Sequence, residues 1–392
     1  MKKIVFTEEF CQPENLFPFT LTRQIQDIRV GILTIREKWE LALGLDSADK
    51  NEGDYKDLEQ SVDIESAASE ALVYLIHGNI IPTNKLVKQV KKLKAGDFIS
   101  VPDRESVIYC ISRNEIVDSN KIKVRKAIEY TDDFKEIKYP WEIFQMNKWA
   151  IEKDFEWITA GRRSQKISST NRVTRAQNIF IEKGAKVEHC FINASDGPVY
   201  IGRNAELMEG AMLRGPVSIG EEAIVKMGTR IYGATTIGPH CVVGGEIKNS
   251  VFFGYSNKAH DGYIGDSVIG EWCNMGAGTS NSNLKNNASS VFIWTPHGPA
   301  NVGLKCGVLM GDYSRTTINT SINTGTVVGV CTHVSGNGLT PKYIPPFSWG
   351  SEGVERYDFE KALKDIQSWK MLKGENLTDN EKTILQHIFD HY

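Results

Sequence analysis

Three features that would each indicate a particular class of protein are missing from this sequence. It has no run of about 18 apolar residues, so we expect no membrane-spanning helix. It has no basic excess, because 46 Lys and Arg stand against 49 Asp and Glu, and this balance argues against a dedicated nucleic-acid binder. The apolar stretch after the Lys-Lys start is cut short by acids, so we interpret it as a first strand and not as a signal peptide.

Cysteine and histidine clusters at metal-binding spacing are missing as well. The seven cysteines are widely scattered, which excludes a Cys-x-x-Cys motif. An odd, scattered set is typical of reduced thiols, so we expect a cytoplasmic protein. His387 and His391 are four residues apart without a third ligand, so we expect no metal site. The cysteines occupy positions 11, 110, 190, 241, 273, 306 and 331.

What the sequence does contain is a repeat of six residues in its second half, where glycine is also concentrated. An aliphatic residue recurs every six positions, and a mostly small residue follows it four positions later. Such a period predicts a solenoid whose rungs bury their core only by stacking on one another. The aliphatic positions are Ile201, Leu207, Leu213, Ile219, Val225, Ile231, Ile237 and Val243, and the second positions are Ala205, Ala211, Val217, Ala223, Thr229, Thr235, Cys241 and Ile247.

The repeat extends beyond this stretch on both sides. It begins near Ile181, resumes out of phase at Ile269, and returns from Val302 to Val334, so we place the solenoid at 172–340 with three hexapeptides to a coil. One insertion, 281–300, lacks the repeat and contains Trp294 and His297. Loops of this length in a compact domain are usually functional, although an excursion without a role is the alternative.

Hexapeptide repeats of this form resemble those of the left-handed parallel β-helix acyltransferases. The segment 246–283 is similar to the acetyltransferase half of the bifunctional bacterial N-acetylglucosamine-1-phosphate uridyltransferases. It shares with that family Glu-x-Lys-Asn-Ser, a His followed three residues later by Tyr, Gly-Asp, and Asn-x-Gly-Ala-Gly-Thr, in this order and at matching spacing. The resemblance implies acetyl-CoA as co-substrate, a homotrimer, and a role in making cell-envelope precursors.

The resemblance also implies roles for individual residues. His260 matches the family's general base, and Ala277 matches the residue whose backbone N–H faces the acetyl-CoA thioester. Asn283 matches an Asn of the following loop on the cofactor side, but the family's next residues, Tyr-Asp-Gly, are replaced by Leu-Lys-Asn. The residues that match the acceptor-binding set, for a sugar phosphate or nucleotide sugar, are Glu246, Lys248, Tyr263 and Asn274.

The chemistry of these residue types is consistent with acyl transfer. A His with an ordinary pKa of about 6.5 removes a proton near neutral pH. A Gly-Ala-Gly turn exposes backbone N–H groups to an oxyanion without side-chain obstruction. Lys and Tyr supply a charge and a hydroxyl to a phosphate and a sugar. An isolated His on a repeat is more often a surface residue, so the assignment of His260 depends on its neighbours.

The first half mixes strand and helix patterns, which predicts an α/β domain over 1–150. We expect strands at 4–6, 71–78 and 97–101, and an amphipathic helix over 82–97 with Leu86, Val90 and Leu93 on its apolar side. The acidic segment 46–65 is interpreted as a loop.

Placed before a β-helix, this domain resembles a shortened sugar nucleotidyltransferase. Residues 15–39 are similar to the Leu-x-Pro-Phe-Thr region that follows the family's Gly-rich phosphate loop, but the stretch 7–14 has three acids and no glycine. The family's Gly-Asp, whose Asp binds Mg²⁺, is Gly78–Asn79 here, and a neutral amide is a poor ligand for a hard dication. We therefore expect a degenerate domain, with Mg²⁺ bound only if it is active.

Two helical regions complete the domain plan. Residues 139–164 are predicted to form a helix that ends near Gly161, so that 151–171 connects the domains. The tail, 341–392, is predicted to form two helices that pack on the end or side of the solenoid, and Thr378 with Glu381 predicts a capping box.

The sequence leaves three hypotheses. The first is acetyl transfer to an amino sugar phosphate or nucleotide sugar, with His260 as base, between the β-helices of a trimer. The second is sugar-1-phosphate nucleotidyl transfer by the first domain. The third is a non-catalytic trimeric scaffold that binds a sugar nucleotide.

Overall fold

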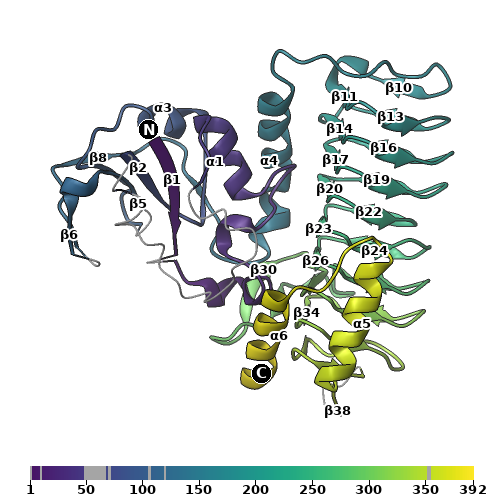
Figure 1. Cartoon of the computed structure of the whole chain (residues 1–392). Coiled ribbons are helices and arrows are strands. Elements are labelled where there is room, and N and C mark those ends of the chain that lie inside the picture. Colours follow the sequence, from purple (N-terminus) through teal and green to yellow (C-terminus); the bar gives the residue numbers. More distant parts are fainter. Residues whose placement is uncertain are drawn as a thin grey trace. The chain divides into compact units, whose positions relative to one another are not determined.

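The chain divides into two compact units in a computed structural model, and we describe each by itself (Figure 1). The first unit comprises Met1–Leu16, Arg23–Ile28 and Leu33–Lys138. The second comprises Phe17–Thr22, Arg29–Ile32 and Tyr139–Tyr392, so two short N-terminal segments cluster with the β-helix. The structure describes residues 2–8, 11–47, 68, 72–104, 107–118, 121–350 and 355–392.

The first unit contains a mixed five-stranded sheet in the order β1-β2-β5-β4-β8. β1 (Lys2–Thr7) and β2 (Leu72–His77) are parallel, and β5 (Val107–Ile111) runs antiparallel to β2. β4 (Asp97–Ser100) pairs antiparallel with β5 and parallel with β8 (Lys126–Glu129). The three strands predicted from the sequence are confirmed. Short pairs are formed by β3 (Ile80–Ile81) with β9 (Lys135–Glu136) and by β6 (Ile116–Asp118) with β7 (Lys121–Ile122).

The helix predicted over 82–97 is shorter than expected. The first α-helix described in this unit is α1 (Ile35–Leu43). The described helix α3 spans only Asn84–Val90, and the hydroxyl of its N-cap residue, Thr83, accepts a hydrogen bond from the Leu86 amide. Beyond Val90 the amides of Lys92 and Leu93 bond three residues back, so a turn replaces the helix. Leu93 is nevertheless buried, as its place in the apolar pattern predicts. The acidic segment 46–65 lies outside the described residues from position 48 onward.

The second unit is built on a parallel β-helix with three faces, which confirms the predicted solenoid (Figure 1). The six-stranded face contains β10 (Arg172–Thr174), β13 (Phe191–Asn193), β16 (Met212–Arg214), β19 (Arg230–Tyr232), β22 (Glu246–Lys248) and β25 (Tyr263–Gly265). The nine-stranded face contains β11 (Ile179–Ile181), β14 (Val199–Ile201), β17 (Val217–Ile219), β20 (Thr235–Ile237), β23 (Val251–Gly254), β26 (Val268–Glu271), β31 (Val308–Met310), β34 (Thr326–Val328) and β36 (Tyr343–Ile344).

The ten-stranded face completes each coil before the chain turns a corner to the next coil. Nine of its strands are parallel, and the last, β38 (Glu355–Arg356), runs antiparallel to β37. The parallel strands are β12 (Lys186–Val187), β15 (Glu206–Leu207), β18 (Ile224–Val225), β21 (Val242–Val243), β24 (Asn257–Lys258), β27 (Asn274–Met275), β32 (Arg315–Thr316), β35 (His333–Val334) and β37 (Ser348–Trp349).

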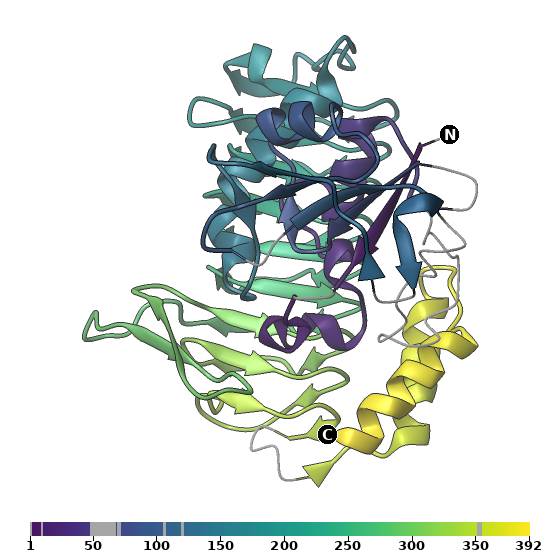
Figure 2. The same ribbon diagram turned by 90° about the vertical axis from the view of Figure 1, so that its left-hand side faces the viewer.

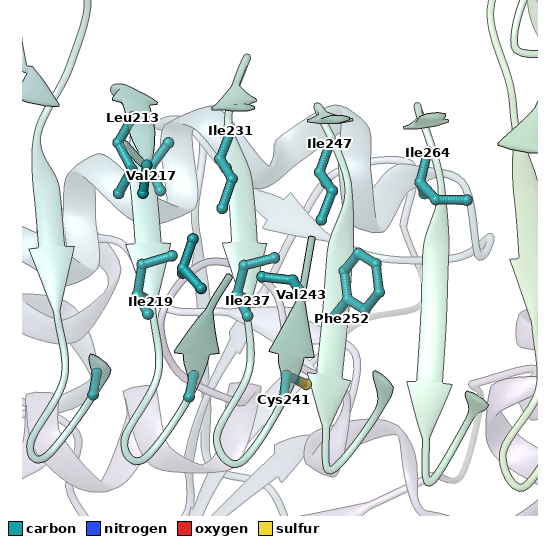
Figure 3. Packing of buried hydrophobic residues seen from close by; sticks show 14 of the residues in the cluster. Leu213, Val217, Ile219, Ile231, Ile237, Cys241, Val243, Ile247, Phe252 and Ile264 are labelled. Carbon is teal, nitrogen blue, oxygen red and sulfur yellow. The ribbon is translucent and has the colours of Figure 1, made fainter. Parts of the chain in front are cut away.

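The interior of the β-helix is formed by the residues of the hexapeptide repeat. All eight predicted aliphatic positions are at most 2% exposed, and all eight second positions are fully buried. Figure 3 shows that like positions of successive coils stack in rows, as in Leu213, Ile231, Ile247 and Ile264. Each row is buried only because its neighbours cover it, which is the reason that a six-residue period predicts a solenoid.

The length of the coils varies along the β-helix. Val217 pairs with Thr235, which makes a coil of three hexapeptides, but Thr236 pairs with Val251, which makes a shorter one. Val268 pairs with Leu309, so that coil is more than twice as long and holds the predicted insertion. Within it, β28 (Ser280–Asn281) pairs with β33 (Ser321–Ile322), while β29 (Val291–Ile293) and β30 (Ala300–Gly303) form an antiparallel hairpin. The prediction that the repeat returns at Val302 is therefore wrong, since Val302 belongs to this hairpin and the coils resume at Val308. Trp294, at the end of β29, stacks on Tyr343 with ring centroids 3.7 Å apart.

Three helices pack on the β-helix within the second unit. The predicted helix at 139–164 is α4 (Glu142–Thr159), which contacts β20 and donates from Asn147 to the carbonyl of Ala234. The tail forms α5 (Phe359–Met371) and α6 (Asp379–His391), and the capping box of Thr378 and Glu381 is confirmed. Both tail helices lie along the side of the coils (Figure 2), where Ile366 and Ile384 share an apolar cluster with Trp272.

Candidate functional site

His260 lies at a corner where the chain passes from the ten-stranded face to the six-stranded face. It follows β24 by two residues, and its side chain is exposed. Asn257 pairs with Asn274 in the next coil, and the same step along the chain leads from His260 to Ala277. The two predicted residues share a cavity of about 330 Å³ at this corner. The cavity is lined by Lys226, Met227, Gly244, Gly245, Ala259, His260, Asp261, Ala277 and Gly278.

The Gly276–Ala277–Gly278 turn borders this cavity through Ala277 and Gly278. The Gly276 amide donates to the carbonyl of Thr316 at 3.1 Å, and the Gly278 amide donates to the carbonyl of Asp261 at 3.0 Å. For the Ala277 amide between them, no acceptor is found in the part of the chain that the structure describes. A side chain at Gly276 would meet the backbone of Thr317 at 2.5 Å, and Gly278 has φ of +78°. Both glycines are therefore needed for the turn that leaves this amide available.

The predicted acceptor residues Glu246 and Lys248 lie side by side on β22 and point outward on the six-stranded face. Tyr232 donates from its hydroxyl to Glu246 Oε1 at 2.7 Å, and Arg230 Nε lies 3.5 Å from Glu246 Oε2. Lys248 Nζ lies 5.8 Å from the centre of the Tyr232 ring. The hydrogen bond to Glu246, together with burial, raises the pKa of Tyr232 to about 12. Through these contacts, Tyr232 lies next to both the Glu246 carboxylate and the Lys248 ammonium group on the same face.

The sequence analysis missed Arg230 and Tyr232. The signal that would have found them is the register, because Arg230 pairs with Glu246 and Tyr232 pairs with Lys248 in adjacent strands. Residues that lie opposite each other on one face of a sheet are close enough for their side chains to interact.

Tyr263 is fixed on the same face by the residue expected on the cofactor side. It lies on β25 opposite Glu246, and Asn283 Nδ2 donates both to its hydroxyl oxygen at 3.1 Å and to Asp266 Oδ2. Asn249 donates to the other oxygen of Asp266 at 2.7 Å. Burial, with Asp266 next in weight, raises the pKa of Tyr263 to about 12, so its hydroxyl keeps its proton. Asn283 thus contacts Tyr263 and is not one of the residues that line the His260 cavity.

Asn274 is separated from the other predicted acceptor residues. It lies on β27 of the ten-stranded face, between Asn257 and Arg315, whereas Lys248 and Tyr263 belong to the six-stranded face. One copy of the chain therefore does not gather all of the predicted acceptor residues on one surface.

A larger groove of about 780 Å³ runs along the six-stranded face and ends at Tyr232. It exposes two large apolar side chains, Phe191 at 51% and Met212 at 47%. Arg172, Arg214 and Arg230 line it together with Thr174 and Asn193. The sequence analysis did not identify this groove, because its polar and exposed apolar residues occupy the outward positions that the six-residue period leaves free.

In the first unit, polar residues that follow β1 and β2 already have hydrogen-bond partners. Glu8 Oε1 accepts a hydrogen bond from the Ile25 amide at 2.6 Å, and burial raises the pKa of Glu8 to about 7. The Cys11 thiol donates to Asn79 Oδ1 at 3.4 Å, and burial raises its pKa to about 12. Asn79 is only 6% exposed, and the described residues contain no group of three His, Cys, Asp or Glu that would hold a metal. This arrangement does not fit Mg²⁺, since a hard dication prefers carboxylates and Asn79 supplies a neutral amide oxygen.

Two general features of the structure can be compared with the sequence, the state of the cysteines and the polarity of the helices. All seven cysteines are free thiols, as the sequence predicts, and six of them are buried. Within the described ranges, each helix is too short or too polar to cross a membrane.

Comparison with known proteins confirms the resemblance drawn from the motifs. A family of sugar nucleotidyl transferases matches residues 4–163. A bifunctional sugar-1-phosphate nucleotidylyltransferase/acetyltransferase of Sulfurisphaera tokodaii is 30% identical over 259 residues, which cover 64% of this chain and 57% of that protein. The bifunctional protein GlmU of Methanococcus vannielii is 26% identical over 240 residues, which cover 59% of this chain and 49% of that protein. The chain thus spans about half the length of these relatives.

Among solved structures, a hexapeptide transferase family protein from Anaplasma phagocytophilum aligns with 58% of this chain and 92% of its own. The sequence identity is 13% and the TM-score is 0.25.

Proposed function

We propose that this chain, a relative of the bifunctional sugar-1-phosphate nucleotidylyltransferase/acetyltransferases, transfers an acetyl group from acetyl-CoA to an amino sugar phosphate or a nucleotide sugar. The observation that carries the proposal is the corner cavity, which His260 and Ala277 line together. It combines an exposed imidazole with a backbone amide for which the described residues supply no acceptor. A base and an oxyanion donor are the two groups that attack on a thioester requires.

Each residue of the corner has a step in this reaction. The His260 ring takes the proton of the acceptor's amine or hydroxyl as that atom forms a bond to the acetyl carbon. The Ala277 amide donates to the carbonyl oxygen as it gains negative charge. The carbon–sulfur bond then breaks, and the CoA sulfur leaves with the proton that His260 returns. The glycines on both sides of Ala277 let the thioester approach the backbone closely.

The six-stranded face supplies the acceptor contacts in this proposal. Lys248 binds the phosphate, and the neutral hydroxyl of Tyr263 donates to a sugar or phosphate oxygen. Glu246, held by Tyr232 and Arg230, accepts from sugar hydroxyls. We assign Asn283 to this side, since its amide positions the Tyr263 hydroxyl.

We further propose that the active form is a homotrimer. Asn274 lies on a different face from Lys248 and Tyr263, and a second copy would supply the missing Asn. The exposed Phe191 and Met212 give the six-stranded face an apolar strip for such a contact. Light scattering at micromolar concentration should give about three times the 43.9 kDa mass of the chain, and a monomer would exclude a site between copies.

The function is tested by a screen of acetyl-CoA turnover. Release of the CoA thiol is followed in the presence of sugar phosphates and nucleotide sugars, each with a free amine or a free hydroxyl. Thiol release that depends on one class of acceptor supports the proposal and separates amine from hydroxyl acetylation. A chain that binds a nucleotide sugar without releasing thiol is the non-catalytic scaffold.

Nucleotidyl transfer by the first unit is the second candidate, because the family of sugar nucleotidyl transferases matches 4–163. The residues after β1 and β2 count against it. Glu8 is half-buried and Asn79 is buried, and each already has a hydrogen-bond partner. The stretch 7–14 has no glycine to open its backbone to phosphate.

A further inference from the structure

A lysine occupies the interior of the β-helix directly below the candidate base. Lys258 is the second residue of β24 and pairs with Val243 of the preceding coil, so it takes the inward position of the repeat. Met275 takes the equivalent position in the next coil. The side chain of Lys258 is 0% exposed. A charged group in an apolar interior is retained only where hydrogen bonds compensate for lost hydration.

The hydrogen bonds of Lys258 go to the turn that bears His260. Its Nζ donates to the carbonyl oxygen of His260 and, at 3.0 Å, to that of Asp261. The Asp261 carbonyl also accepts the hydrogen bond from the Gly278 amide of the next coil. One ammonium group is thus bonded to the turn of the base, and that turn is bonded to the Gly276–Ala277–Gly278 turn.

We propose that Lys258 is a positioning residue that holds the His260 turn and the Gly276–Ala277–Gly278 turn at a set separation from inside the β-helix. This inference rests on the proposed acetyl transfer for its catalytic meaning. Neither His260 nor Ala277 has a side chain that anchors it in the core, so both depend on the backbone beneath them. A displacement of about 1 Å between reacting groups costs on the order of a hundredfold in rate.

The charge of Lys258 changes near the pH at which the protein would be assayed. Burial lowers its pKa to about 8, and Asp261 is the charged group that acts in the opposite direction. Among the side chains stacked on Lys258 in the core, Val243 and Met275 are uncharged. Loss of the proton removes the charge assistance of both hydrogen bonds, which roughly halves the strength of such a bond. The two turns should therefore be held less firmly above pH 8.

The first test compares Lys258→Met with Met275→Leu. Methionine already fits this inward position in the next coil, so Lys258→Met should fold. Met275→Leu is a volume-conserving change beside the second turn that keeps both hydrogen bonds of Lys258. We expect kcat for acetyl transfer to fall about 10- to 100-fold in Lys258→Met, with KM for acetyl-CoA changed less than about threefold and no loss of melting temperature. An unchanged kcat would overturn the proposal, as would a fall in kcat matched by Met275→Leu.

The second test needs no acceptor. Amide hydrogen exchange of residues 276–280, measured by mass spectrometry, should be faster in Lys258→Met than in Met275→Leu, because Gly278 bonds to a carbonyl that Lys258 holds. In the unmodified chain, protection of the same peptide should fall as pH rises through about 8, after correction for intrinsic exchange. Equal exchange in the two variants, or pH-independent protection, would overturn the role of Lys258. If no acceptor is acetylated, the proposed acetyltransferase function is contradicted, whereas the exchange measurement still tests the structural role of Lys258.

Discussion

The end of the first strands in the first unit and the corner of the β-helix in the second both gather polar groups, yet they leave different groups available. In the first unit, Glu8 accepts from a backbone amide and Cys11 donates to Asn79. At the corner, the amides of Gly276 and Gly278 donate to carbonyl oxygens, whereas the Ala277 amide has no acceptor among the described residues and the His260 ring is exposed. The difference teaches that a site is indicated by the hydrogen-bonding groups that remain available beside a cavity and not by polar residues alone.

Backbone shape separates the two regions further. The stretch 7–14 contains no glycine, so its sequence offers no position without a side chain. The corner has glycine at 276 and 278, where a Cβ would collide with the next coil or strain the backbone. Four predictions test this contrast between a closed region and an open one.

The largest effect is expected at His260. Replacement of His260 by Ala removes the proposed base and should slow acetyl transfer about 10²- to 10⁴-fold, because general-base catalysis contributes that much. The side chain is exposed at a corner, so the melting temperature should stay within a degree or two of the unmodified chain. His297→Ala, an exposed histidine of the insertion, is the matched control. Near-native transfer by folded His260→Ala would show that the corner is open but not catalytic.

A smaller effect is expected at Lys248. Its replacement by Ala should raise KM for a phosphorylated acceptor about 10- to 100-fold, because a hydrogen bond to a charged group contributes about 1.5–3 kcal/mol. We expect kcat to change much less, since His260 and Ala277 are untouched. Lys186→Ala, on the ten-stranded face of the first coil, serves as control. Equal KM values for Lys248→Ala and Lys186→Ala would contradict the proposal that the acceptor binds on the six-stranded face.

The third prediction concerns Glu8 in the first unit and how the stability of the chain depends on pH. The pKa of Glu8 rises from 4.5 to about 7 on folding, so the folded chain binds more protons between these values and its stability falls as pH rises from 4.5 to 7. Glu8→Gln keeps an oxygen acceptor for the Ile25 amide but has no charge. By denaturant unfolding, this variant should match the unmodified chain near pH 4.5 and exceed it by about 1–3 kcal/mol at pH 8. A constant difference across pH would mean that Glu8 is not buried as a carboxylic acid.

The smallest effect is expected from nucleotides. With a nucleoside triphosphate, a sugar-1-phosphate and Mg²⁺, release of pyrophosphate should stay at background, because Asn79 supplies a neutral amide oxygen where Mg²⁺ prefers a carboxylate. Rapid release of pyrophosphate would contradict the contrast between the two regions, since it would show that the first unit binds and converts a nucleotide.

The sequence predicted the β-helix better than the first unit, for a physical reason. A six-residue period places an aliphatic residue at the same inward position in every hexapeptide, as at Ile219 and Ile237. Because the pattern recurs many times, a chance match is excluded. The helix over 82–97 depends on one apolar stripe, and its last turns were lost although Leu93 stayed buried. Local patterns determine which residues are buried more firmly than where an element ends.

Within the candidate site, motif and register gave different kinds of information. The motif identified His260 and Ala277, and the register between successive coils brings them to one cavity. Arg230 and Tyr232 belong to no motif and appear only once the strands are aligned. The motif breaks off directly after Asn283, and the contact of Asn283 with Tyr263 was not predictable from spacing.

By itself, the sequence determined the stacking of coils, the place of the insertion and the order of the chemical groups along the corner, because each depends on spacing along the chain. The tertiary structure alone decided which of those groups remain available. Whether the Ala277 amide finds an acceptor among the described residues, and whether Asn79 bonds to Cys11, depend on residues far away in the chain. Lys258 lies inside the β-helix because its strand pairs with Val243 of the preceding coil. Hydrogen bonding is settled by neighbours in space, and only the folded chain brings those neighbours together.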